Sequence, residues 1–364
     1  MYAPPLSLYV HLPWCVKKCP YCDFNSYSLA RGQAADASVR ARYLDALLLD
    51  LELEATRVTD RELVSIFLGG GTPSLFTPAE ISRLLAASAR NFSWCDDIEI
   101  TMEANPGTVE CGDPAAYRAA GVNRLSIGAQ SFSDASLSLL GRVHDSADIT
   151  RAVTAAIGAG FANINIDIMY GLPGQSVAAA LYDLERAIAL GPQHISWYQL
   201  TLEPNTVFYA RPPKGLPDND FGFEIQMAGQ ALLRKHGYLQ YEVSAYAKPG
   251  RRCRHNENYW SFGDYLAVGA GAHGKLTQAG KSHRYEKPAN PASYMQHFES
   301  RSTTQADALP TPLAREALLF EFMLNALRLS DGFDENLLPD RTGLTVDYLA
   351  ARAEVATRRA LLER

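Results

Sequence analysis

Short β-rich runs and longer segments with helical apolar spacing alternate along the first 236 residues. Alternation at this rate predicts a parallel sheet with right-handed crossovers. Six such units indicate an α/β fold, either a partial (β/α)6 TIM-like barrel or an open α/β sheet, and we predict the barrel. Glycine, proline and polar residues follow the strands, at the end where barrel active sites lie. Strands are expected at residues 7–12, 62–68, 97–103, 124–127, 163–169 and 194–202, and helices at 40–56, 78–90, 113–120, 148–160, 176–190 and 220–236.

The pattern changes after residue 240. We expect one more strand at 240–247, then a glycine-rich segment at 263–274, a linker at 296–310, and helices at 313–328 and 345–358. A chain of 364 residues is long enough for one large and one small domain. We therefore predict a barrel at 1–240 with a metal-binding loop at 11–24, an extension with the linker at 241–305, and a small helix-rich C-terminal domain at 306–364.

Composition narrows the class of protein. Hydrophobic residues make up 47% and charged residues 20% of the chain, as in ordinary globular proteins. The net charge is −6, and no basic run is longer than the short patch at 251–255, so we expect no nucleic-acid partner. Neither a signal peptide nor a run of 18 apolar residues is visible. The sequence thus predicts a cytoplasmic protein that is not an integral membrane protein.

Three of the six cysteines, Cys15, Cys19 and Cys22, have the spacing C-x3-C-x2-C. Pro13 and Pro20 bracket and interrupt the segment, which favours a loop over a helix. Three soft thiolates suit an iron–sulfur cluster with one open iron. The alternative is a zinc site completed by His11 or a distant cysteine. Cys95, Cys111 and Cys253 lie alone, so no second C-x2-C pair is present.

Polar and glycine residues end several predicted strands. The run from Gly69 to Pro73 could bring exposed backbone groups against a ligand, or could be only a structural turn. Carboxylates at strand ends could accept ribose hydroxyls or an ammonium, and an arginine could pair with a carboxylate. Taken singly, each residue is more often solvated, but together they converge on one face of the predicted barrel. The set is Glu103, Gln130, Arg142 and Asp167.

A second dense motif, HNENYW, spans residues 255–260. A histidine, an amide and two aromatic rings could hold a flat macrocycle such as haem. The alternative is a loop in which Tyr259 and Trp260 pack against the barrel and His255 is exposed. The residues alone favour this packing loop.

Several long motifs carry a family resemblance. The cysteine loop resembles the signature of the radical S-adenosylmethionine superfamily. In order, YVHLPWCVKKCPYCDF, FLGGGTPS, ITMEANPG, GVNRLSIGAQSF, LGRVH, NIDIMYGLPGQ and HNENYW resemble the oxygen-independent coproporphyrinogen III oxidase family over essentially the whole chain. The decarboxylases of that family usually carry a fourth cysteine where this chain has Phe24. This residue, the HNxxYW motif and the short stretch before the first strand are similar to the HemW branch, understood as haem chaperones.

The resemblance implies a radical SAM fold and roles for particular residues. Cys15, Cys19 and Cys22 would hold a [4Fe–4S] cluster, whose open iron would bind S-adenosylmethionine. The haem candidates are His255, Asn256, Tyr259 and Trp260. The S-adenosylmethionine site would be lined by Tyr9, Tyr21, Gly70, Gly71, Thr72, Glu103, Gln130, Arg142, Asp167 and Thr201.

The leading hypothesis is a haem chaperone that binds haem and transfers it to haem-requiring proteins such as respiratory oxidases. One alternative is an oxygen-independent coproporphyrinogen III dehydrogenase, a radical decarboxylase. A second is a zinc-stabilised structural protein without a redox cofactor. Peripheral membrane contact and homodimerisation are left open by the sequence.

Overall fold

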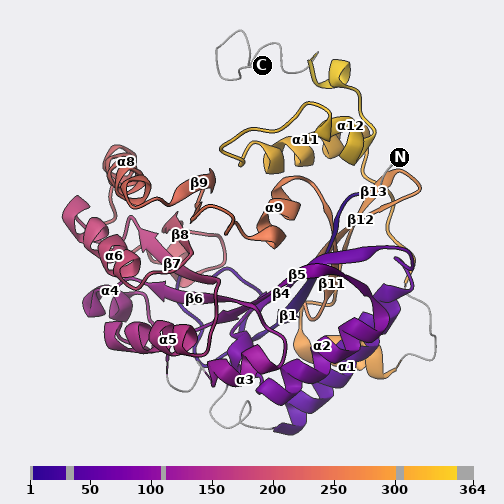
Figure 1. Cartoon of the computed structure of the whole chain (residues 1–364), viewed down its shortest axis with the longest axis horizontal. Coiled ribbons are helices and arrows are strands. Elements are labelled where there is room, and N and C mark those ends of the chain that lie inside the picture. The colour runs from indigo at the N-terminus through magenta and orange to yellow at the C-terminus, as the bar shows by residue number, and fades with distance from the viewer. Residues whose placement is uncertain (1–2, 30–36, 108–111, 301–306, 351–364) are drawn as a thin grey trace.

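One large sheet organises the chain (Figure 1). The computed structural model describes residues 3–29, 37–107, 112–300 and 307–350. Within these residues the sheet has eleven strands. Their order is β13 (Lys281–Glu286), β12 (His273–Gln278), β11 (Asp264–Val268), β1 (Leu6–Leu12), β4 (Glu62–Gly70), β5 (Ser93–Ala104), β6 (Arg124–Gln130), β7 (Ile164–Tyr170), β8 (His194–Gln199), β10 (Ala245–Ala247) and β9 (Leu239–Glu242).

The strands β1, β4, β5, β6, β7 and β8 run parallel and are neighbours in chain order. Helices follow each of them, which confirms the predicted α/β fold with six βα units. Figure 1 shows these helices along the outside of the curved sheet. They are α1 (Ala37–Ala55), α2 (Pro78–Asn91), α3 (Pro114–Ala119), α4 (Asp134–Leu139) with α5 (Ser146–Gly158), α6 (Val177–Ala189), and α7 (Val207–Ala210) with α8 (Asn219–Lys235).

Side chains alternate in character along the parallel strands. In β7, Ile164, Ile166 and Ile168 belong to the main hydrophobic core, whereas Asn165 and Asp167 hydrogen-bond to residues of neighbouring strands. Successive strand residues point to opposite faces of a sheet. The apolar face therefore packs on the helices, and the polar face lines the barrel interior. The candidate site lies where this polar interior opens at the carboxyl ends of the strands.

The chain after residue 238 departs from the sequence prediction in several places. Instead of one strand at 240–247, β9 and β10 form an antiparallel hairpin. Instead of a loop, residues 254–260 form the helix α9 (Arg254–Trp260), with Cys253 at its N-cap. Asn258 ties α9 to β1, because its Nδ2 donates to Ser7 Oγ at 2.8 Å. Folding against the barrel thus imposes a helix on a short polar motif.

β11 pairs in parallel with β1, so part of the predicted extension continues the barrel sheet. α10 (Pro291–Glu299) overlaps the expected linker. The predicted helix at 313–328 is α11 (Arg315–Ala326), and α12 (Leu337–Thr342) follows it. Residues 346–350 are helical, and the rest of the helix expected at 345–358 lies outside the described residues. Of the described helices, none combines the length and apolar character needed to span a bilayer.

The helix-rich C-terminal part has its own small core. It packs on the barrel through Phe262, which lies between α9 and β11 and contacts Phe322 of α11 with ring centroids 5.6 Å apart. The remaining buried members of this core are Leu318, Leu319, Ala326, Leu338 and Leu344.

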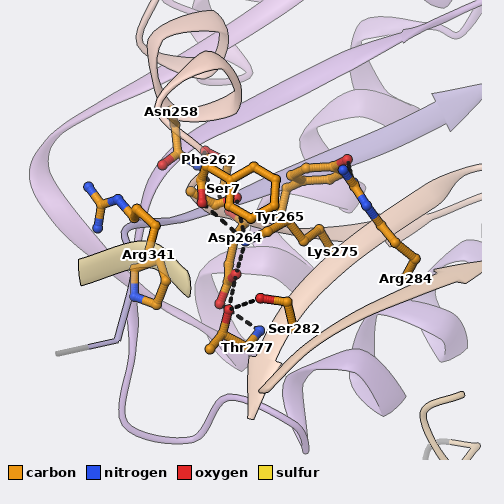
Figure 2. A network of polar contacts seen from close by, with 12 residues as sticks. Ser7, Asn258, Phe262, Asp264, Tyr265, Lys275, Thr277, Ser282, Arg284 and Arg341 are labelled. Carbon is orange, nitrogen blue, oxygen red and sulfur yellow. Dashed lines mark hydrogen bonds and ion pairs between the residues drawn. The ribbon is translucent and has the colours of Figure 1, made fainter. Parts of the chain in front are cut away.

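Asp264 connects these parts at the start of β11 (Figure 2). Its carboxylate is fully buried and accepts a hydrogen bond from Lys275 Nζ at 2.9 Å and another from Arg61 Nη1 at 2.9 Å. Thr277 donates to it through both its backbone N–H and its hydroxyl, each at 2.9 Å. Lys275 Nζ also donates to the carbonyl of Phe262 at 3.0 Å. A single carboxylate therefore joins β11, β12 and the residue before β4, and Lys275 extends this network to Phe262 of the C-terminal core.

We expect Asp264→Asn to lower the free energy of unfolding by about 3–5 kcal/mol, because it leaves the buried Lys275 ammonium without its counter-charge. Chemical denaturation measures the loss. The control is Asp45→Asn, which breaks an exposed ion pair with Arg83 and should change little. Equal effects of the two substitutions would contradict this account of Asp264.

Candidate cofactor site at the barrel mouth

The cysteine segment is an irregular loop, as the prolines predicted. It starts at β2 (Trp14–Cys15) and returns at β3 (Tyr27–Ser28), which pairs with β2 in parallel. Backbone bonds from Tyr27 N to Pro13 O (2.8 Å) and from Leu29 N to Cys15 O (2.9 Å) close the loop. These bonds hold the loop at the carboxyl end of β1, and all three cysteines lie within the closed segment.

The glycine turn after β4 fits directly against this loop. Gly71 N donates to Leu12 O at 2.8 Å, and Thr72 N donates to Trp14 O at 2.7 Å. A Cβ on Gly71 would lie 2.6 Å from Trp14 O, and Gly70 has a φ of +111° and faces the His11 ring. Glycine is required here because two backbones meet without room for a side chain. The turn is therefore part of the loop's support and more than a generic connection.

Loop and turn border a cavity of ≈ 260 Å³ at the carboxyl ends of the strands. Most of the residues predicted for the cluster and for S-adenosylmethionine line it together. They are Cys15, Cys19, Cys22, Tyr21, Gly70, Gly71, Thr72, Glu103, Gln130, Arg142 and Asp167.

Two predicted residues lie elsewhere. Tyr9 is in the barrel interior, where its hydroxyl is 3.0 Å from His11 Nδ1, and it does not line the cavity. Thr201 is exposed after the end of β8. The structure does not bring either side chain to the cavity wall.

Sequence reasoning missed other residues of the wall. Asn105 donates to Thr72 Oγ1 at 3.0 Å and accepts from Arg142. Tyr198 donates to Gln130 Oε1 at 2.6 Å, and Gln130 itself has the left-handed φ of 70°. The signal for Tyr198 was its interior-facing register on β8, but an aromatic residue there also suits a core. The other missed residues are Lys17, Ser26, Ala104, Ser126 and Gly128, together with Phe24, which had been considered only as a branch marker.

Arg142 provides positive charge beside the thiols. Its guanidinium donates to Gly128 O at 2.9 Å and lies 3.6 Å from Cys19 Sγ. Burial raises the pKa of Cys15 to about 11, and burial also raises the pKa of Cys22. A metal must deprotonate these thiols to bind them. The nearby guanidinium favours the resulting negative charge.

Two buried carboxyl groups form the opposite wall. Gly70 N donates to Glu103 Oε2 at 3.1 Å, and Asp167 accepts from Ser126 (3.1 Å) and Asn165 (2.8 Å). Burial and then the nearby Asp167 charge raise the pKa of Glu103 to about 8, and burial raises the pKa of Asp167. A cation bound between the two would favour their ionised forms. This wall therefore suits a ligand with an ammonium or sulfonium group.

The donor set fits an iron–sulfur cluster better than a zinc ion. Both His11 nitrogens are engaged, with Tyr9 and with Asn25 O. Cys253 is buried against Glu99, and Cys111 lies outside the described residues. Zinc-bound sulfurs lie within about 4 Å of one another, since Zn–S bonds are about 2.3 Å long. Across the described parts of the chain, no three His, Cys, Asp or Glu side chains gather closely enough for one metal ion.

The HNENYW motif is divided between two environments. His255, in the first turn of α9, lies in the barrel interior, 3.4 Å from Ser65 Oγ and with its ring centroid 4.9 Å from that of Phe67. Tyr259 and Trp260, in the last turn, line a second cavity of ≈ 1440 Å³. Asn256 is half-buried and lines neither cavity. The structure therefore does not unite the four haem candidates in one pocket.

We expect Gly71→Ala to displace the cysteine loop, because its Cβ would overlap the Trp14 carbonyl. Iron bound per chain after anaerobic reconstitution should fall sharply, and the free energy of unfolding should fall by about 1–3 kcal/mol. Gly158→Ala is the matched control, since a Cβ there meets nothing within 4 Å. Wild-type iron content in Gly71→Ala would refute the role given to this turn.

Glu103 should make the ligand-free protein less stable as the pH rises. Its pKa is 4.5 when unperturbed and about 8 here, so ionisation is disfavoured in the folded state. The free energy of unfolding should therefore decline between those two pH values. Glu103→Gln should remove this part of the decline, measured by denaturation across pH, while Glu62→Gln at the exposed start of β4 should not. Parallel curves for all three proteins would contradict the assignment.

Comparison with known proteins places this geometry in a family. A model of the radical SAM superfamily matches residues 9–186. The chain is 47% identical to heme chaperone HemW of Haemophilus influenzae, over 94% of this chain and 87% of that protein. It is 46% identical to heme chaperone HemW of Escherichia coli, over 97% and 90%.

A solved structure is also similar over nearly the full length. It is that of coproporphyrinogen III oxidase HemN from Escherichia coli, described as a radical SAM enzyme. The TM-score is 0.80 at 26% identity, covering 98% of this chain and 83% of that one. The chain therefore belongs to the HemW branch of the oxygen-independent coproporphyrinogen III oxidase family, within the radical SAM superfamily.

Proposed function

We propose that this protein is a haem chaperone, which binds haem and passes it to haem-requiring proteins. The relatives that share 46–47% of its residues over nearly its whole length carry the name heme chaperone. The observation that carries the proposal is the separation of two cavities. No residue lines both the cysteine-lined cavity at the barrel mouth and the aromatic cavity beside α9, within the parts of the chain that the structure describes.

A [4Fe–4S] cluster and S-adenosylmethionine follow from membership of the radical SAM superfamily. Cys15, Cys19 and Cys22 would hold the cluster, which would supply an open iron and an electron. Glu103 and Asp167 would neutralise the cationic groups of S-adenosylmethionine, and the Gly70–Gly71 turn would admit it close to the backbone. We expect Tyr9 to act on the S-adenosylmethionine site only indirectly, because its hydroxyl holds His11 beneath the Gly70–Gly71 turn.

The aromatic cavity is the better place for haem. Its lining includes Tyr259 and Trp260 of the HNENYW motif, and its volume of ≈ 1440 Å³ exceeds the usual range for small-molecule pockets, roughly 300–1,000 Å³. α9 covers the amino ends of β1 and β4, since its His255 and Asn258 contact Ser65 and Ser7. The cluster lies at the opposite, carboxyl ends. The cavity also reaches Asn25, next to Phe24 and Ser26 of the cysteine-lined cavity, so haem beside α9 would occupy the end of this cavity that lies away from the cysteines.

The decarboxylase hypothesis needs the macrocycle at the barrel mouth instead. There the chain has Phe24, with 59% of its surface exposed, where the decarboxylases usually carry a fourth cysteine. An exposed phenyl ring cannot replace a thiol as a metal ligand or proton donor. The substitution favours retention of the cofactor site without decarboxylation.

Further features of the proposal concern partners. Transfer of haem to respiratory oxidases, peripheral membrane contact, homodimerisation and a cytoplasmic location stay predictions from the sequence and the family.

Anaerobic reconstitution, followed by haem titration and transfer to an apo-acceptor, tests the function. We expect iron and sulfide in the wild type, haem binding, and no vinyl product from coproporphyrinogen III under anoxia with a reductant. Cys15→Ser should lose the cluster, since a hydroxyl is a poor ligand for soft metal centres, and should keep haem binding. Vinyl product would overturn the chaperone hypothesis. Zinc without iron in the wild type would favour the structural alternative.

A further inference from the structure

The cavity beside α9 carries chemistry that the family motif does not describe. One of its walls is formed by the last turn of α9, by β11 and β13, and by α11 and the residues after it. Figure 1 shows α9 between the barrel strands and α11. Aromatic rings and guanidinium groups lie together in this wall, which includes Tyr259, Trp260, Tyr265, Arg284 and Arg328 beside the carboxylate of Glu321.

The aromatic part of the wall is continuous. Tyr259 and Tyr265 have ring centroids 4.9 Å apart at 33°, and Tyr259 meets Trp260 edge-on with centroids 4.8 Å apart. Tyr265 follows Asp264, whose buried ion pair fixes the start of β11 (Figure 2). Tyr265 is therefore held on a rigid strand, Tyr259 of α9 packs against it, and the Trp260 ring stands nearly perpendicular to that of Tyr259.

Two arginines border these rings, and each is oriented by a carboxylate. Arg284 Nε donates to Glu321 Oε2 at 2.7 Å, and its guanidinium lies beside the Tyr265 hydroxyl (Figure 2). Arg328 Nη2 donates to Glu242 Oε2 at 2.9 Å, and its guanidinium lies 4.2 Å from the centre of the Trp260 ring. Because Glu242 does not line the cavity, it orients Arg328 without occupying the cavity side.

Two donors in this wall lack an acceptor. Trp260 Nε1 and Arg328 Nε are buried without a hydrogen-bond partner among the residues that the structure describes. A buried donor without an acceptor destabilises the folded state. A carboxylate that entered the cavity beside Arg328 would supply an acceptor to its Nε, with a small movement of the Arg328 side chain. An arginine also pairs with carboxylates in a bidentate manner.

We propose that Arg284 and Arg328 bind the two propionates of a porphyrin that enters this cavity beside Tyr259 and Trp260. This assignment rests on the proposed function, because it takes haem as the ligand. The ligand class is a flat macrocycle with carboxylate groups on one edge. Recognition then lies in the propionate edge, while His255 remains in the barrel interior.

The test compares haem with its dimethyl ester, which has the same ring and iron but no free carboxylates. Titration is followed by Soret absorbance with the full-length protein. We expect Arg328→Ala and Arg284→Ala each to weaken haem binding about tenfold, as the loss of a charge-assisted hydrogen bond predicts. The wild type should bind the ester more weakly than haem, and the double variant should no longer distinguish them.

Glu321→Gln is the matched control, because it breaks the same ion pair as Arg284→Ala but keeps the guanidinium. It should leave haem affinity unchanged or increase it; if it weakens binding as much as Arg284→Ala, the arginine acts only through the fold and the proposal fails. Arg83→Ala, in an exposed pair on the far helices, should have no effect. Wild type that binds haem and ester equally overturns the propionate assignment alone. Wild type that binds neither overturns the haem chaperone function and this inference with it.

Discussion

The close backbone contact between the cysteine loop and the glycine turn is the constraint on which the site depends. Leu12 and Trp14 carbonyls accept hydrogen bonds from Gly71 and Thr72, so the loop after β1 becomes an extension of the β1–β4 pairing. Sheet geometry thereby fixes a loop that has little regular structure of its own. The thiols inherit their position from the sheet, as do Glu103 and Arg142 on the neighbouring strands and loops.

The polar interior of the barrel follows from the same register. Each parallel strand turns apolar residues toward the helices and polar residues inward, and the innermost groups are buried carboxyls, amides and a guanidinium. Burying such groups costs free energy unless they are hydrogen-bonded. Most here are paired across strands, as Asn165 is with Ser126 and Asp167. The raised pKa of Glu103 shows that this compensation is incomplete at the barrel mouth, where a cationic ligand could complete it.

The sequence pattern predicted those features of the fold that depend on local signals in the chain. The alternation of strand and helix segments predicted the six parallel strands. The cysteine spacing and the two prolines around it predicted the cysteine loop. The sequence pattern could not predict that residues 240–247 split into a hairpin, because the turn at 243–244 contains neither Gly nor Pro. It also favoured a loop for the HNENYW motif, since a seven-residue helix has no strong periodicity and forms here by packing on β1 and β4. Asn105 and Tyr198 were missed because their roles arise from contacts between strands distant in sequence.

α9 gives the motif two functions at once. Its first turn closes the amino end of the barrel, where Glu99 Oε1 accepts hydrogen bonds from the Arg254 and His255 backbone N–H groups. Its last turn presents Tyr259 and Trp260 to the outer cavity. The same short helix therefore contacts both the barrel interior and the cavity beside it. A haem beside Tyr259 and Trp260 would lie toward the amino ends of the strands, whereas the cysteine loop follows the carboxyl end of β1, so α9 ties the aromatic wall to the barrel without reaching the cluster site.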